Sequence, residues 1–176
     1  MENKKLALIA IFISLSVALR VFKNMLTTLQ FINIPLVFTM FSGVMLGCKA
    51  GLIVGLFSYT LSDMLILLGP WTIVNSLLAG VIGLCWGMLR KIQDQFLLGL
   101  LSFLSIFIFD VFSSVILYIV FGLDVFSAFI YGFLGLFIPV VGGGLVGVGP
   151  LTELSSTLVF LFFLKIGRKE VEKYVT

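Results

Sequence analysis

The residues of this sequence that could do chemistry are few, because most of the chain is apolar. Ionisable side chains inside a membrane span are costly, and they usually mark a pathway, a ligand site or a buried ion pair. Carboxylates, a guanidinium and amides can hold a polar ligand, and a tryptophan can lie over a planar one. The candidate ligand-binding residues are Arg20, Asn33, Asp63, Trp71, Asn75, Asp110 and Glu153.

Catalysis and metal binding have little support in the sequence. It contains no histidine, which removes the commonest transition-metal ligand and the commonest acid–base group. Cys48 and Cys85 lack the spacing of a metal site, so we expect both to be packing residues. The G-x-x-x-x-G-K-[ST], H-E-x-x-H and G-x-S-x-G motifs do not occur. We therefore expect no catalytic residue, no metal and no cofactor, and a protein that is not an enzyme.

The composition requires a membrane. Of the 176 residues, 61% are hydrophobic and 11% are charged, whereas a soluble domain carries about 25% charged residues. A helix needs about 20 apolar residues to cross the hydrocarbon, and six such spans fit the chain. We predict one all-α membrane domain over residues 1–176, with six transmembrane helices. The predicted spans are 5–23, 32–48, 51–68, 72–89, 96–121 and 150–167. Residues 122–149 are interrupted by glycine and proline toward their end, which favours a re-entrant or interfacial segment.

Basic residues set the predicted orientation. Six spans with a cytoplasmic N-terminus leave only Arg20 and Lys23 on the outer side, and they place both termini in the cytoplasm. The basic residues then on the cytoplasmic side are Lys4, Lys5, Lys49, Arg90, Lys91, Lys165, Arg168, Lys169 and Lys173. This is a strong positive-inside bias. A seventh span at 124–140 would place the basic C-terminal tail on the outer side of the membrane, so we reject it. The positive net charge reflects membrane topology and does not indicate nucleic-acid binding.

This topology brings the candidate residues to the outer level of the membrane. Five spans and one loop contribute them, which favours an outward-facing polar pocket over simple packing. Gly69-Pro70 ends the third span, and Trp71 follows at the outer rim. Each residue has a structural alternative. Arg20 could pair with Asp63 or Asp110, Glu153 could complement a helix dipole, Trp71 could anchor at the interface, and Asn75 could bond a neighbouring helix.

Small residues form a second pattern. Ala10, Ser14 and Ala18 share one face of the first span, and Ala79, Gly83 and Gly87 share one face of the fourth. Such stripes allow two helices to approach closely in lipid. Packing within this protein explains either stripe, and the first could equally be a docking face for a partner.

Residues 31–84 resemble the substrate-binding S components of energy-coupling factor (ECF) vitamin transporters. The similar features are an Asn-x-Pro start to the second span, an LG-x-x-AG turn, a GPWT loop and a G-x-x-GL continuation. The resemblance implies a six-helix protein that binds a vitamin from outside. It also implies a complex with a transmembrane coupling protein and two cytoplasmic ATPases. The family's first helix meets the coupling protein through an Ala-x-x-x-Ala signature. The matching positions here are Ala10 and Ser14, or Ser14 and Ala18, so serine replaces one alanine of the pair. The loops that cover the ligand in the family correspond to 24–33, 68–73 and 122–149.

The ligand is less well specified by the sequence. The GPWT loop most resembles that of S components assigned to cobalamin and related compounds, which implies a cobalamin-like ligand, although Ile73 and Val74 depart from that pattern. The acid-rich pocket could instead favour a cationic ligand such as thiamine. The cobalt and nickel members use an N-terminal histidine that this chain lacks, which disfavours metal ions. The alternatives to an S component are a small membrane enzyme acting on a lipid, with Asp63 and Asp110 as a carboxylate pair, and a structural membrane subunit without a ligand.

Overall fold

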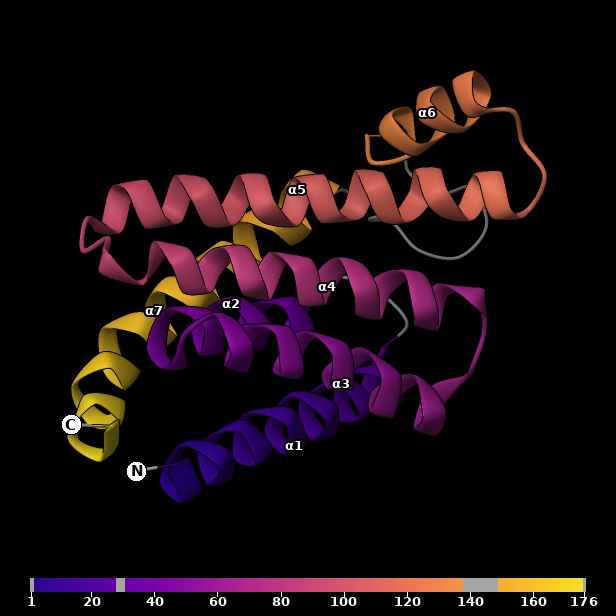
Figure 1. The fold of residues 1–176 in the computed structure, drawn as a ribbon. Coiled ribbons are helices and arrows are strands. Elements are labelled where there is room, and N and C mark those ends of the chain that lie inside the picture. Colours follow the sequence, from indigo (N-terminus) through magenta and orange to yellow (C-terminus); the bar gives the residue numbers. More distant parts are fainter. Residues whose placement is uncertain (1, 28–30, 138–148, 176) are drawn as a thin grey trace.

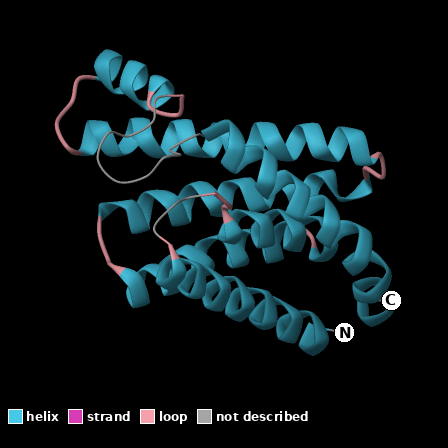
Figure 2. Cartoon of the chain, turned by 180° about the vertical axis from the view of Figure 1, so that it is seen from behind, coloured by secondary structure: helices cyan, strands magenta, loops and turns pink. Residues whose placement is uncertain are grey.

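The computed structural model describes residues 2–27, 31–137 and 149–175, and within α7 the side chains up to residue 168. The described chain is all helical and contains no strand (Figures 1 and 2). Its helices are α1 (Glu2–Leu26), α2 (Ile34–Leu46), α3 (Cys48–Ile66), α4 (Pro70–Met88), η1 (Leu89–Lys91), α5 (Gln95–Val120), α6 (Val125–Leu134) and α7 (Gly149–Val175).

Five helices are long and apolar enough to cross a membrane, namely α1, α3, α4, α5 and α7. Four of them begin and end within a few residues of a predicted span, and the apolar part of α7, Pro150–Arg168, matches the predicted span 150–167. The predicted all-helical membrane protein is therefore confirmed. The predicted span 32–48 is shorter than expected, because α2 has 13 residues. At 1.5 Å per residue it measures about 20 Å, less than the roughly 30 Å of hydrocarbon.

The shortness of α2 has a local cause. The Asn33 side chain caps its start, Pro35 occupies its first turn, and Gly47 ends it with a φ of 90°. Eleven of its 13 residues are buried, since α2 packs against α1, α3, α4 and α7. A helix enclosed by protein does not have to match the thickness of the lipid.

The segment expected to be re-entrant contains one described helix, α6. Asp124 caps it by accepting a hydrogen bond from the Ser127 backbone N–H at 3.0 Å. Phe133 packs on Phe107 of α5, with ring centroids 6.0 Å apart, so α6 lies along the second half of α5 (Figure 1). The glycine-rich part of the expected segment, residues 138–148, lies outside the described residues.

Glycines bring α2, α3 and α4 unusually close together. A Cβ on Gly51 would lie 2.2 Å from the Gly83 carbonyl oxygen, and one on Gly87 would lie 2.2 Å from the Cys48 backbone nitrogen. A Cβ on Gly55 would lie 2.6 Å from the backbone of Ala79. The small-residue stripe of the fourth span therefore serves packing within the protein.

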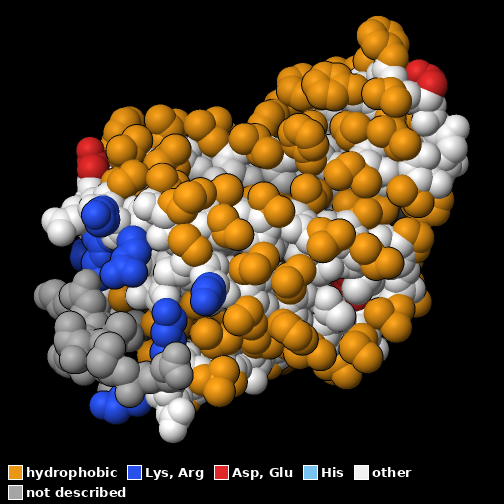
Figure 3. All heavy atoms as spheres, in the orientation of Figure 1, with side chains coloured by type: hydrophobic (Ala, Val, Ile, Leu, Met, Phe, Trp, Pro, Cys, Tyr) orange, Lys and Arg blue, Asp and Glu red, His pale blue; other side chains and the backbone are white. Residues whose placement is uncertain are grey.

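The chain has two chemically different ends. Both termini and η1 lie at one end, and the α3–α4 and α5–α6 connections lie at the other (Figure 1). Lysine and arginine side chains gather at the end that carries the termini (Figure 3). The shared position of the termini agrees with the predicted topology, and their cytoplasmic location remains a prediction.

Candidate ligand-binding pocket

A cavity of about 340 Å³ lies between the helices toward the end opposite the termini. Helices α1 to α5, the chain before α2 and after α6, and the start of α7 all contribute to it. Its lining residues are Arg20, Lys23, Ile32, Asn33, Pro35, Tyr59, Asn75, Phe109, Asp110, Ser113, Ser114, Gly135, Leu136 and Thr152. The cavity is therefore formed by segments from the whole length of the described chain.

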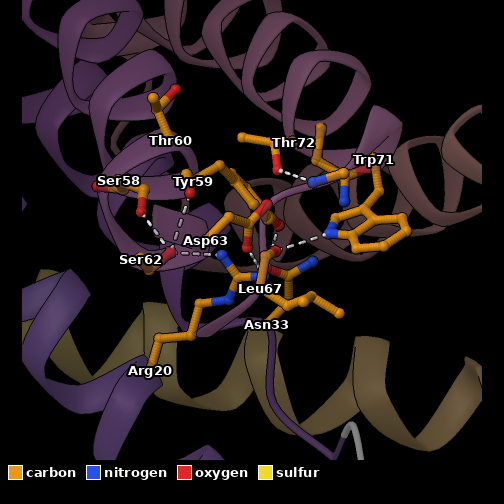
Figure 4. Close-up of polar contacts among 12 residues, drawn as sticks. Arg20, Asn33, Ser58, Tyr59, Thr60, Ser62, Asp63, Leu67, Trp71 and Thr72 are labelled. Carbon is orange, nitrogen blue, oxygen red and sulfur yellow. Dashed lines mark hydrogen bonds and ion pairs between the residues drawn. The ribbon is translucent and has the colours of Figure 1, made fainter. Parts of the chain in front are cut away.

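Arg20 is held in the cavity wall by three contacts from α3 (Figure 4). Its Nη2 atom lies 2.7 Å from the Asp63 Oδ1 atom, and its Nη1 atom donates a hydrogen bond to the Ser62 hydroxyl. Its guanidinium carbon lies 4.9 Å from the centre of the Tyr59 ring. The Asp63 side chain is 2% exposed and that of Arg20 is 15% exposed. Asp63 therefore lies behind Arg20 and orients it toward the cavity.

Asn33, which lines the cavity, is hydrogen-bonded to residues of α2, α3 and α7. Its Oδ1 atom accepts hydrogen bonds from the Leu36 backbone N–H at 3.3 Å and from the Tyr59 hydroxyl at 2.6 Å. Its backbone N–H donates to the Ser156 hydroxyl of α7 at 2.8 Å. Because the oxygen is occupied, the amide nitrogen is the atom of this side chain that a ligand can use.

Asn75 presents the same kind of group from α4. Its Oδ1 atom accepts a hydrogen bond from the Ser113 hydroxyl of α5. This bond joins two helices, as the structural alternative for Asn75 required, and again leaves the amide nitrogen as a donor toward the cavity.

Two further carboxyl groups come from the second half of α5 and from the start of α7. Asp110 lines the cavity, and Glu153 is close enough to interact with it electrostatically. Glu153 is fully buried outside the lining, and neither of its carboxyl oxygens has a hydrogen-bond partner among the described residues.

Trp71 lies at the α3–α4 connection and outside the cavity lining. Its indole N–H donates to the Leu67 carbonyl at 3.2 Å, and its ring covers Gly69, where a Cβ would lie 2.4 Å from the Trp71 Cη2 atom. Of the residues selected from the sequence, the cavity thus brings together Arg20, Asn33, Asn75 and Asp110. The structure places Asp63, Trp71 and Glu153 around it.

Several lining residues outside the predicted set share a helix face with a predicted one. Ser113 and Ser114 lie three and four positions after Asp110, so they share its helix face. Lys23 follows Arg20 by three positions in the same way. The rings of Tyr59 and Phe109 stack 5.4 Å apart. Their positions in the sequence do not identify them as lining residues, because aromatic residues are common along these helices.

The predicted docking stripe lies on a free face of α1. Ala10, Ser14 and Ala18 are exposed. Ser14 and Ala18 border an apolar groove between α1 and α3, together with Leu61 and Met64. The use of this face by a partner remains a prediction.

Metal binding finds no support in the described part of the chain, where no three histidine, cysteine, aspartate or glutamate side chains come together.

Comparison with known proteins identifies the class. A family model described as "ECF-type riboflavin transporter, S component" matches residues 1–155, whereas searches of curated proteins and of solved structures return no match. S components are substrate-binding membrane subunits of transporters, so the protein is a multi-pass membrane protein and not a lipid-modifying enzyme. The match includes every residue that lines the cavity. Because it covers most of the 176 residues, the chain belongs to the family of ECF-type riboflavin transporter S components.

Proposed function

We propose that this protein captures riboflavin in the outer cavity and passes it to a transmembrane coupling protein that is driven by two cytoplasmic ATPases. The observation that carries the proposal is the cavity itself, which presents hydrogen-bond donors, an acceptor and aromatic surface within the region that matches the family.

The cavity groups suit the polar edge of a flavin. The isoalloxazine ring carries two carbonyl groups on either side of one N–H, so it needs donors for the carbonyls and an acceptor for the N–H. The amide nitrogens of Asn33 and Asn75 can donate, and Arg20 adds a third donor. Asp110 supplies the acceptor.

The remaining lining groups suit the rest of the molecule. Tyr59 and Phe109 supply aromatic surface for the flat ring system. Ser113 and Ser114 supply hydroxyl groups that can pair with the hydroxyls of the ribityl chain. A neutral planar ligand with a polar edge and a polyhydroxyl tail therefore matches the chemistry of the site.

Two other vitamins fit less well. The cobalamin-like ligand favoured by the GPWT loop finds no support in a family described by riboflavin. A corrinoid is also several times larger than a flavin, and about 340 Å³ lies near the lower end of the usual range for ligand pockets. Thiamine is cationic, and a cavity lined by Arg20 and Lys23 as well as Asp110 lacks the excess of negative charge that a cation needs.

Orientation and partner docking complete the proposal. The positive-inside rule puts the basic end that carries the termini in the cytoplasm, which opens the cavity to the outside. The exposed stripe of Ala10, Ser14 and Ala18 then supplies the surface for the coupling protein, because small residues let a second helix approach closely.

A titration of the purified, ligand-free protein with riboflavin tests the proposal. We expect saturable binding of one riboflavin per protein, measured by calorimetry and by flavin fluorescence. Asn75→Ala removes one donor, so it should weaken binding about tenfold. Ser76→Ala is the matched control, because Ser76 lies in the same turn, donates only to the Ile73 carbonyl and lies outside the lining. Absence of riboflavin binding, or tighter binding of thiamine or cobalamin, would contradict the proposed ligand.

A further inference from the structure

A second groove lies between α5 and α7, close to the end that carries the termini. The two helices are in contact where Ser102 donates to the Thr157 hydroxyl at 3.2 Å and where Gly99 faces Leu161. Beyond these contacts, toward the start of α5 and the end of α7, they enclose the groove. Its lining residues are Gln95, Leu98, Phe162, Leu164, Lys165, Ile166 and Arg168.

The groove is apolar along its length and basic at its end. Leu98 and Leu164 are buried and form its floor, whereas Phe162 and Ile166 are 58% and 53% exposed. Lys165 is exposed as well. Figure 3 shows lysine and arginine side chains next to apolar ones at this end of the molecule. A binding surface of this kind suits a molecule with a hydrocarbon part and an anionic part.

The two cations of the groove are not neutralised by the described chain. The Arg168 Nη2 atom donates to the Ile92 carbonyl oxygen at 3.0 Å, which fixes the guanidinium and leaves its other N–H groups available. The ion pair between Arg20 and Asp63 lies in the other pocket, and no ion pair among the described residues involves Lys165 or Arg168. Neither Lys165 nor Arg168 therefore has a carboxylate partner within the part of the chain that the structure describes.

The position in the membrane identifies the occupant. The basic end of the molecule is the cytoplasmic end by the positive-inside rule, so the two cations lie at the level of the inner headgroups. Basic pockets between transmembrane helices on this side suit phosphate-containing headgroups. We propose that the groove binds one anionic phospholipid of the cytoplasmic leaflet, with its phosphate at Lys165 and Arg168 and an acyl chain along Phe162 and Ile166.

Native mass spectrometry of the detergent-purified protein tests this site. Phosphatidylglycerol and phosphatidylcholine with identical acyl chains are added separately, and their apparent affinities are compared. We expect a preference for phosphatidylglycerol that falls about fivefold in Lys165→Gln and further in Lys165→Gln/Arg168→Gln, since each basic residue contributes to the attraction. Lys49→Gln/Lys91→Gln is the matched control, because both lysines are exposed and lie outside the groove. This control should keep the preference.

Several results would overturn the lipid site. Equal affinity for the two lipids would show that the cations do not recognise the phosphate. An equal loss in the control pair would show a diffuse surface charge instead of a site. Displacement of the lipid by inorganic phosphate alone would show a simple anion site. If the groove variant keeps its lipid preference but no longer binds the coupling protein, the groove binds a protein partner and not a lipid. Circular dichroism and gel filtration verify that each variant is folded.

Discussion

At the scale of single residues, Asp63 and Arg20 illustrate how a buried pair can serve a binding site. Arg20 lines the cavity, while Asp63 lies behind it and has only one oxygen in the ion pair. The second oxygen, Oδ2, is buried without a hydrogen-bond partner among the described residues. Helix pairing and ligand binding were alternatives for Arg20 in the sequence, and the geometry is compatible with both at once.

Replacing Asp63 tests this dependence. Asp63→Asn removes the charge that holds Arg20, and breaking a buried ion pair on one side costs about 3 kcal/mol of folding stability. We expect a lower thermal midpoint in detergent and weaker riboflavin binding. The double variant Arg20→Met/Asp63→Leu should recover the stability, because an apolar pair can replace a buried ion pair, while riboflavin binding stays weak. Unchanged binding in Asp63→Asn would show that the ligand does not need Arg20 in this position.

At the scale of helices, close contacts through glycine decide where the polar side chains can meet. The backbones of α3 and α4 approach each other closely at Gly51 and Gly83. This approach aligns Tyr59 and Asp63 on α3 with Asn75 on α4, two to three turns away from the contact. The position of the cavity therefore depends on packing in the other half of the molecule.

A single methyl group tests the helix contact. A Cβ at position 51 would lie 2.2 Å from the Gly83 carbonyl oxygen, and that atom belongs to the backbone. We expect Gly51→Ala to destabilise the protein by about 3 kcal/mol and to lower the riboflavin affinity, as measured by thermal unfolding and titration.

Gly99→Ala is the control for this prediction. Its Cβ would lie 3.3 Å from the flexible Leu161 Cδ1 atom, and alanine favours a helix over glycine by about 1 kcal/mol. Its stability should stay close to that of the wild type. If the Gly51→Ala protein is as stable as the Gly99→Ala protein, α3 and α4 can move apart without loss of folding stability.

At the scale of the whole molecule, the two ends have separate roles. One end carries the cavity, and the other carries the termini and the basic side chains. A capture protein needs this asymmetry, because the ligand arrives on one side and the ATPases act on the other. The orientation of the ends is therefore the property on which the proposed transport direction depends.

Labelling of introduced cysteines measures this orientation. In a Cys48→Ala/Cys85→Ala background, we expect a membrane-impermeant maleimide to label Leu68→Cys on intact cells, because Leu68 is exposed at the cavity end. Lys91→Cys, at the opposite end, should react only after permeabilisation. The reverse pattern would place the cavity in the cytoplasm and exclude capture from outside.

The sequence by itself determined the membrane class, the all-helical fold and most helix bounds, because hydrophobic length is a local property of the chain. It also determined that Arg20, Asn33, Asn75 and Asp110 belong to one level of the membrane, since a helix rises by a fixed amount per residue. Only the tertiary structure decided which atoms meet at that level. Side-chain neighbours on different helices depend on helix rotation and crossing, and these depend on contacts distant in sequence, such as that between Gly51 and Gly83.

The tertiary structure also decided the length of α2 and the place of Asp63 and Trp71. A span that must meet lipid has to be long, whereas α2 is enclosed by four other helices and can be short. Asp63 lies behind Arg20, and Trp71, in the first turn of α4, donates a hydrogen bond back to the Leu67 carbonyl at the α3–α4 connection. Spacing along one helix cannot distinguish a side chain that lines a cavity from one that supports it, because both point to the same side of the helix.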